Sequence, residues 1–213
     1  MKTTLKVVRH NLDAKIFNSC YVVDRQGHLI ANHRKVILFP DIDNRYFTAG
    51  TGHLVLTLTT LGGQQFKAVV GICADMDPRP DKGQYDYMLA DICRDNQVDC
   101  LIFPTAWDHY PDKCEGMSPK EIAIDIYNFW LSRLTPMIHE KLQVEKVIHP
   151  RYSNEWLFIG ADRVGQEMGV DFKGCSTVIV FNRQSQNSDY FHVEDMLDHL
   201  NDGIILVQSL LKR

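Results

Sequence analysis

The sequence predicts an α/β domain, and three observations lead to that class. The run 67–74, interrupted only by Gly71, is apolar and too short for a buried helix, so it is typical of a buried strand. Residues 83–96 repeat apolar side chains at helical spacing, and residues 99–103 form another short apolar run. Strand, helix and strand at this spacing make a βαβ unit with parallel strands. Because no repeat or linker divides residues 1–213, we expect one domain.

The N-terminal part predicts more strands joined by turns. These strands cover residues 1–10, 20–23, 28–31 and 54–60. Gly27, which tolerates positive φ, closes a hairpin between the second and third of them. The hairpin continues into residues 33–39, where two cations precede four apolar residues. Residues 40–53 are largely polar and are expected to form a loop.

A helix start is predicted at Ser118. Pro119 occupies the first turn, and Glu121 lies three residues after the cap, which is the capping-box pattern. The apolar face of this helix comprises Ile122, Ile126, Phe129 and Trp130. Pro136 is expected to end or kink the helix, because proline lacks the N–H that the next turn needs.

The C-terminal part predicts two further buried strands, over residues 156–161 and 177–181, linked by a glycine-rich polar segment. From His192 to the end the pattern is helical, although Gly203 weakens its middle. The whole chain therefore alternates strands and helices, as an α/β domain does.

Composition and charge restrict the partners. A hydrophobic content of 45% and a charged content of 23% are typical of a soluble globular protein. The formal charge of −4 offers no basic field for nucleic acid. No apolar run approaches the length of a membrane span, and the N-terminus lacks the apolar core of a signal peptide. We therefore expect neither nucleic acid nor a membrane as partner, and a cytoplasmic protein.

The cysteines do not predict disulfides or a metal site. The six are Cys20, Cys73, Cys93, Cys100, Cys114 and Cys175. They are dispersed through a chain of ordinary size, unlike the dense framework of a small secreted domain. No Cys-x-x-Cys pair is present, and the flanking of a loop by His109 and Cys114 is too weak a pattern for zinc. Reduced thiols and no metal are expected.

Cys73 is the cysteine whose position suggests chemistry. It ends the buried run 67–74, and Gly71, Pro78 and Pro80 indicate that the chain turns there. The end of a buried strand is where α/β proteins place functional groups. The alternative is that Cys73 is one more small apolar core residue, because free cysteine commonly behaves so.

Five blocks of sequence carry a resemblance to a known family. They are Arg-Lys-Val-Ile-Leu-Phe at 34–39, Gly-Ile-Cys-Ala-Asp at 71–75, Phe-Pro-Thr-Ala-Trp at 103–107, Ala-Asp-Arg-Val-Gly at 161–165 and Phe-Lys-Gly-Cys-Ser at 172–176. In this order and spacing the chain resembles the nitrilase superfamily of carbon–nitrogen hydrolases from about Phe17 to Phe181. The stretch 73–107 is most similar to the eukaryotic protein N-terminal amidase branch. The resemblance implies an αββα sandwich when two subunits pack, a homodimer and no cofactor.

The resemblance also implies roles for individual residues. Cys73 would attack the amide carbonyl and form a thioester. Lys35 would lower the thiol pKa and hold the oxyanion, together with the backbone N–H of Ala74. Trp107, at the end of the next strand, would line the same pocket. Without the resemblance, Lys35 could equally be a solvated lysine after a hairpin.

The general base of the family has no counterpart in this sequence. The family uses a glutamate well before the lysine, whereas the first glutamate of this chain is Glu115. We expect that the chain begins late and lacks the first strand–helix unit of the family domain. Asp43 is the candidate acid, with a solvated loop aspartate as the alternative. Asp162, where the family often has asparagine, and Cys175 are further departures from its pattern.

The sequence therefore predicts a hydrolase acting on non-peptide carbon–nitrogen bonds through a cysteine thioester. Its substrate would be a small amide or the N-terminal asparagine or glutamine of a protein or peptide. The alternative is a catalytically silent nitrilase-like fragment that serves as an interaction or partner subunit. A nucleotide-binding α/β protein is disfavoured because no Gly-x-Gly-x-x-Gly loop follows a strand.

Overall fold

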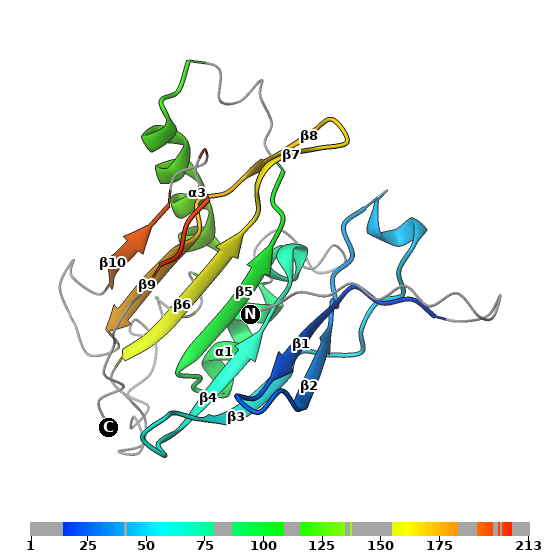
Figure 1. The fold of residues 1–213 in the computed structure, drawn as a ribbon, viewed down its shortest axis with the longest axis vertical. Helices are drawn as coiled ribbons and strands as arrows, with labels where there is room; N and C mark the ends of the chain where they lie inside the picture. The colour runs from blue at the N-terminus through cyan, green and yellow to red at the C-terminus, as the bar shows by residue number, and fades with distance from the viewer. Residues whose placement is uncertain are drawn as a thin grey trace.

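A six-stranded sheet of order β10-β9-β6-β5-β4-β3 forms the centre of the computed structural model (Figure 1). The structure describes residues 15–40, 42–78, 87–108, 116–134, 137, 155–182, 191–197, 200 and 202–205. The sheet strands are β3 Leu54–Thr59, β4 Gln65–Val70, β5 Cys100–Thr105, β6 Glu155–Asp162, β9 Thr177–Asn182 and β10 Phe191–Met196. The predicted α/β class is therefore confirmed.

The three central strands are parallel, which brings their carboxyl ends to one edge of the sheet. β4 pairs with β5 in parallel, and β5 pairs with β6 in parallel, so that Thr105 lies opposite Asp162. The other pairs of this sheet are antiparallel. Parallel strands arranged in this way gather the residues that follow them into one region. Residues after Val70 and Thr105 therefore meet near Asp162.

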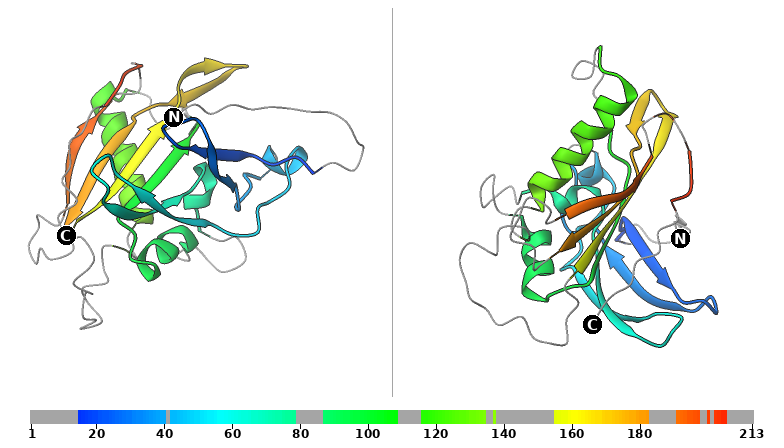
Figure 2. Two further views of the ribbon diagram at one scale, coloured as in Figure 1. Left: turned by 60° about the horizontal axis from the view of Figure 1, so that its bottom comes forward. Right: turned by 90° about the vertical axis from the view of Figure 1, so that its left-hand side faces the viewer.

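Helices cover one face of the sheet and a hairpin lies on the other (Figure 2). Helix α1 Met88–Asp95 and helix α3 Pro119–Arg133 pack on the sheet through a core that contains Leu89, Trp130 and Phe158. The hairpin joins β1 Ser19–Val23 to β2 Leu29–Arg34, with positive φ at Gly27. A second cluster, formed by Cys20, Val70 and Ile72, connects the hairpin to the sheet.

The capping box of α3 forms as predicted. The Ser118 hydroxyl accepts the Glu121 N–H at 3.3 Å, and the Ser118 N–H donates to the Glu121 carboxylate at 2.7 Å. The two residues thus satisfy two of the amide groups that a helix start leaves without acceptors. Trp130 on the same helix is fully buried and lies edge-on to Phe158, with 5.4 Å between ring centroids.

The prediction of a helix from His192 is wrong for its first residues, which form strand β10. This strand pairs antiparallel with β9, with a register shift between Val193 and Asp195. Phe191 and Met196 at its ends pack against the main core, while the residues between them are exposed. The open edge of β9 supplies a backbone partner, and such tertiary pairing overrides a weak local pattern.

The segment between β6 and β9 contains a hairpin that the sequence analysis treated only as a polar link. Strand β7 Val164–Glu167 pairs with β8 Val170–Lys173 through a turn at Met168 and Gly169. Both turn residues have positive φ, which suits a two-residue hairpin but is unusual for methionine. The predicted continuation of the first hairpin into residues 33–39 is wrong beyond Arg34, where strand β2 ends. Residues 35–39 are not part of that strand.

Several predictions fall outside the described residues. These are the strand at 1–10, the His109–Cys114 loop and the helix end at Pro136.

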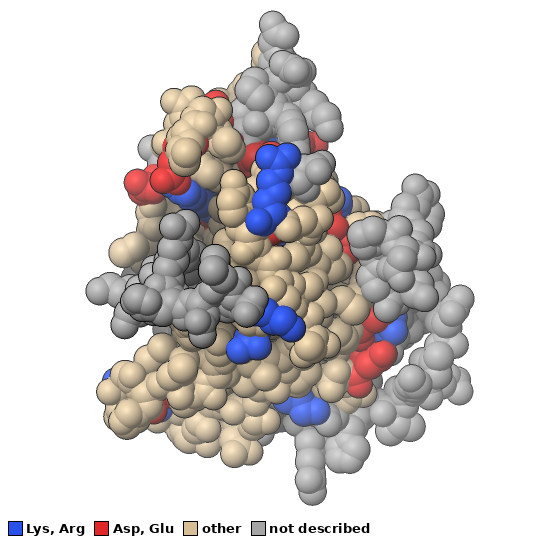
Figure 3. Space-filling model, turned by 90° about the vertical axis from the view of Figure 1, so that its right-hand side faces the viewer, with Lys and Arg blue, Asp and Glu red and all other residues tan. Residues whose placement is uncertain are grey.

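On the face drawn in Figure 3, basic and acidic side chains lie scattered among uncharged residues. Among the residues that the structure describes, no helix is long and apolar enough to cross a membrane.

Candidate active site

Cys73 lies in a strained turn immediately beyond the central strand β4. It begins the short 3-10 helix η2 Cys73–Met76, and its φ of 47° falls in the left-handed region that non-glycine residues avoid. Backbone strain of this kind is common at functional sites. Gly71, two residues earlier, has no room for a side chain, because an added Cβ would lie 2.5 Å from the Leu89 side chain. Packing against α1 thus fixes the approach to the turn.

Opposing influences act on the thiol of Cys73. Burial raises its pKa above the ordinary value and is the largest influence. The Lys35 charge, the Thr105 hydroxyl and the Ala106 N–H each lower the pKa, and the charge of Asp162 raises it. Lys35 is therefore close enough for its charge to favour the thiolate, and its catalytic role stays a prediction. The pKa remains raised overall, so formation of the thiolate depends strongly on these neighbours.

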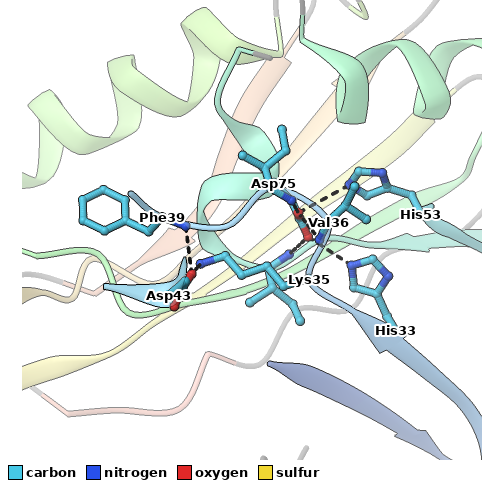
Figure 4. Close-up of polar contacts among 9 residues, drawn as sticks. His33, Lys35, Val36, Phe39, Asp43, His53 and Asp75 are labelled. Atoms are coloured by element: carbon cyan, nitrogen blue, oxygen red, sulfur yellow. Dashed lines mark hydrogen bonds and ion pairs between the residues drawn. The ribbon is translucent and has the colours of Figure 1, made fainter. Parts of the chain in front are cut away.

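Lys35 and Asp43 form a buried ion pair. Lys35 Nζ donates to Asp43 Oδ2 at 2.5 Å, and the two side chains are 3% and 9% exposed (Figure 4). Asp43 stands at the start of the 3-10 helix η1 Asp43–Arg45 and also accepts the Phe39 N–H at 3.0 Å. The alternatives of a solvated lysine and a solvated loop aspartate are therefore wrong. A buried charge pair positions the ammonium group firmly, because neither charge can turn to water.

Asp75 ties the lysine loop to the cysteine turn. Its Oδ1 accepts the N–H groups of Val36 and Ile37, both at 2.8 Å, and its Oδ2 accepts the Ile72 N–H at 2.9 Å. These donors flank Lys35 on one side and Cys73 on the other. The carboxylate is fully buried, and burial is the largest influence and raises its pKa. The His33 hydrogen bond, the His53 charge and the Ile37 and Ile72 N–H groups together outweigh burial, so the pKa is lowered below the ordinary value. Asp75 therefore links the backbone that follows Lys35 to the backbone that precedes Cys73.

Two buried histidines complete the Asp75 cluster (Figure 4). His33 Nε2 donates to Asp75 Oδ2 at 3.0 Å, and His53 Nε2 lies 3.8 Å from Asp75 Oδ1. The two rings stack with centroids 5.4 Å apart. Burial is the largest influence on the pKa of His53 and lowers it, the charge of Asp75 raises it, and that of His33 lowers it.

These three residues are the group that could hold a metal, because their ligand atoms lie within 4.8 Å of one another. The sequence analysis expected no metal site and missed the group, since its members come from three separate segments. Asp75 already accepts four hydrogen bonds, which occupy the lone pairs that a cation would need. We therefore interpret the cluster as a hydrogen-bonded support for the neighbouring site.

The remaining predicted residues are buried or partly buried. Ala74 is buried in the first turn of η2, where helical N–H groups have no acceptor within the helix. Trp107 is partly buried and packs edge-on against Phe129, with 4.7 Å between ring centroids. Its N–H donates to Asp162 Oδ1 at 2.9 Å. Cys175 is buried, and its thiol donates to the Lys173 carbonyl at 3.2 Å.

Comparison with solved structures identifies the fold. The structure superposes on a crystal structure of N-terminal amidase with a TM-score of 0.63 and 16% identity, covering 89% of this chain and 73% of that chain. It also matches glutamine-dependent NAD+ synthetase from Acinetobacter baumannii, with a TM-score of 0.55, 18% identity, and coverage of 91% of this chain and 28% of that one. The chain has the nitrilase fold.

The nitrilase fold was the expectation from the five sequence blocks, and it is now confirmed. A complex of N-terminal amidase with a Gln-Val peptide matches with a TM-score of 0.64 and the same 16% identity and coverage. No protein-family model and no curated protein matches the chain. At such low identity, the likeness to the solved structures concerns the fold.

We expect Gly50→Ala to disturb the site, because Gly50 supports the backbone of Lys35. The Gly50 N–H donates to the Lys35 carbonyl at 2.8 Å, and a Cβ on Gly50 would lie 2.3 Å from the Arg34 carbonyl oxygen. The clash should cost about 1–3 kcal/mol and slow alkylation of Cys73 by iodoacetamide. Urea unfolding and timed mass spectrometry would measure both effects.

Gly52→Ala is the matched control, because no atom lies within 4 Å of a Cβ added there. It should leave both the urea midpoint and the alkylation rate near those of the wild type. Equal behaviour of the two variants would contradict the role assigned to Gly50.

Proposed function

We propose that the protein is a carbon–nitrogen hydrolase that cleaves non-peptide amides through a thioester on Cys73. The observation that carries the proposal is the pairing of a strained cysteine with a buried lysine at the carboxyl edge of three parallel strands. A thiol alone in a core would need no cation beside it, and a lysine is rarely buried without a partner and a purpose.

Each residue contributes a separate element of amide cleavage. Cys73, as thiolate, attacks the carbonyl carbon, and the carbonyl oxygen becomes an oxyanion. Lys35, held by Asp43, stabilises both the thiolate and that oxyanion, and the Ala74 N–H is the second donor. Loss of the amine leaves a thioester, which water then hydrolyses. Trp107 forms part of the wall around the acyl group.

The proposed substrates are the side-chain amides of N-terminal asparagine or glutamine in peptides and proteins. Support comes from the similar fold of N-terminal amidase, whose structures include complexes with Gln-Val and Asn-Glu peptides. A cytoplasmic homodimer remains the prediction from the sequence. The support for the N-terminal amidase branch is a likeness of fold at 16% identity. The first assay should therefore include other small amides as well.

The second candidate is a silent nitrilase-like subunit that binds a partner without turnover. The observation that favours it is the raised pKa of the Cys73 thiol, because burial outweighs the Lys35 charge that would favour the reactive thiolate. This candidate predicts a Cys73 that reacts with iodoacetamide no faster than an ordinary buried thiol. Cys100 is the internal reference for such a thiol, because burial raises its pKa to about 12.

Replacing Cys73 with alanine should abolish ammonia release from peptides that begin with asparagine or glutamine, because no nucleophile remains. The expected loss of kcat exceeds about 10³-fold. A coupled ammonia assay would measure it, and intact-protein mass spectrometry of the wild type should detect an acyl adduct on Cys73.

Cys93→Ala is the control, because Cys93 is a buried thiol on α1 in the main core. This variant should retain turnover. An alanine variant of Cys73 with full activity would rule out the proposed nucleophile, whereas wild-type protein with no turnover on any amide would favour the silent subunit.

A further inference from the structure

Asp162 is an acid of the site to which the nitrilase resemblance assigns no role. It is the last residue of β6 and lies opposite Thr105 at the carboxyl edge of the sheet. The Thr105 hydroxyl lowers the pKa of the Cys73 thiol, and the charge of Asp162 raises it. The sheet register therefore places the Asp162 carboxyl group at the same edge of the sheet as the cysteine turn, on the strand two places away from β4.

The hydrogen bonds of Asp162 use only one of its carboxyl oxygens. Oδ1 accepts the Trp107 N–H at 2.9 Å, and the backbone N–H of Asp162 donates to the Ser176 hydroxyl at 3.0 Å. Oδ2 is buried and has no hydrogen-bond partner within the described part of the chain. Burying a charged carboxylate oxygen without a hydrogen-bond donor is unfavourable in free energy. Protonation removes the charge and with it most of this unfavourable free energy.

The charged groups around Asp162 act in both directions. Burial is the largest influence and raises the pKa of Asp162 to about 8. Lys173, on β8, lowers this pKa, and Asp108, in the segment after β5, raises it. The Cys73 thiol is a further titratable group at this edge of the sheet, and the charge of Asp162 raises its pKa. These surroundings therefore favour the neutral form of Asp162 near pH 7.

Asp43 and Asp162 differ in the form that their surroundings favour. Asp43 is bonded to a lysine ammonium group, which suits a carboxylate. Asp162 is buried, and its Oδ2 has no hydrogen-bond partner among the described residues, which suits a neutral acid. Two carboxyl groups whose surroundings favour opposite protonation forms commonly divide their roles. The neutral group acts as an acid, and the ionised group acts as a charge partner.

We propose that Asp162 is the proton donor to the leaving nitrogen and later the base that activates water, a role that rests on the proposed amide hydrolase function. Asp43 then serves to hold Lys35. A proton-carrying residue 89 positions after the nucleophile would not be found from the order of the family blocks, because the family pattern calls for a base before the lysine.

The proton transfers balance over one cycle. The Cys73 thiolate adds to the carbonyl carbon; the C–N bond breaks, and the nitrogen leaves with the Asp162 proton as ammonia. This step leaves a thioester and an Asp162 carboxylate. Water gives a proton to that carboxylate while its oxygen attacks the thioester. The C–S bond then breaks, releasing the carboxylic acid product and restoring the Cys73 thiolate and the neutral Asp162.

Asp162→Asn tests this role, because the amide keeps the size, the neutrality and an acceptor for the Trp107 N–H but carries no transferable proton. We expect amide turnover to fall at least about 100-fold. With p-nitrophenyl acetate, whose leaving group needs no proton, the variant should release one equivalent of nitrophenolate and then stall as an acyl-enzyme. Wild-type protein should show the burst followed by steady turnover.

Asp125→Asn is the matched control, since Asp125 is an exposed aspartate on helix α3 and takes no part in the proposed cycle. It should hydrolyse both substrates within about twofold of the wild type, as surface substitutions usually allow. If Asp162→Asn hydrolyses amide and ester like the wild type, its role is structural and the proposal is overturned.

Failure of the amide function would be separable from failure of this proposal. Wild-type protein that turns over the ester but no amide would contradict the amide substrate, while the stalled ester burst of Asp162→Asn would still support the proton role. The pH profile of iodoacetamide alkylation gives a readout without substrate. Above pH 8 the ionised Asp162 opposes the Cys73 thiolate, so the variant should react faster than wild type at pH 9 and equally at pH 6. Coincident profiles would overturn the proposal.

Discussion

Replacing Lys35 with methionine is expected to abolish amide turnover and to destabilise the protein by roughly 3–5 kcal/mol. Methionine preserves much of the apolar stem but leaves the buried Asp43 carboxylate without its partner at 2.5 Å. The thiolate of Cys73 loses a positive charge that favours it, so its pKa should rise further. Ammonia release, urea unfolding and the pH profile of Cys73 alkylation would measure the three effects.

A double variant separates stability from chemistry at this pair. Lys35→Met combined with Asp43→Asn removes both charges, so it should recover part of the lost stability, because no lone buried charge remains. It should recover no turnover, since the cation is still absent. Lys67→Met, at the opposite end of β4, is the control; Lys67 Nζ donates to the Asn96 carbonyl at 3.1 Å, away from Cys73. Undiminished alkylation in Lys35→Met would disprove the role of the lysine.

The fold could be predicted largely because its strands are local apolar runs and its helices have clear starts. The run at 67–74 predicts β4, and the Ser118 capping box predicts the start of α3. Strand β10 could not be predicted in this way, because its existence depends on the open edge of β9. The β7–β8 hairpin was missed because Met168 occupies a position where glycine or asparagine is expected.

The candidate site was predictable only in part. Cys73 and Lys35 lie in distinctive sequence blocks, so their proximity follows from the nitrilase resemblance, and the structure brings them together. The support from Asp75, His33 and His53 depends on buried contacts between distant segments, which no spacing rule covers. A histidine two positions before the lysine was the only available signal, and a single histidine is a weak one.

Replacing Asp75 should have the second large effect, because its carboxylate is shared by the two halves of the site. Asp75→Ala would leave the Val36, Ile37 and Ile72 N–H groups without an acceptor in the protein interior. Each unpaired buried donor costs about 1–3 kcal/mol, so a total loss of roughly 3–5 kcal/mol is expected after relaxation. Lys35 should drift from Cys73, and alkylation at pH 7 should slow accordingly.

Asp75→Asn and Asp99→Asn distinguish positioning from general stability. Asp99 is also buried in the sheet region, where it accepts the Lys67 N–H at 2.8 Å, but it lies at the end of β4 away from Cys73. Both variants should lower the urea midpoint. Only Asp75→Asn should move the pH profile of Cys73 alkylation to higher pH, and equal profiles would contradict the positioning role.

The pH dependence of stability gives an independent measure of the Asp75 carboxylate. Its pKa is lowered in the folded protein, so the carboxylate stabilises the fold above the ordinary aspartate value of about 4, and this contribution is lost as pH falls through the lowered folded pKa. The stability difference between wild type and Asp75→Asn should therefore be largest near neutral pH and shrink below pH 4. A stability difference that does not depend on pH would contradict this role of the charge. It would mean that the packing of the Asp75 side chain, and not its negative charge, joins the Lys35 loop to the Cys73 turn.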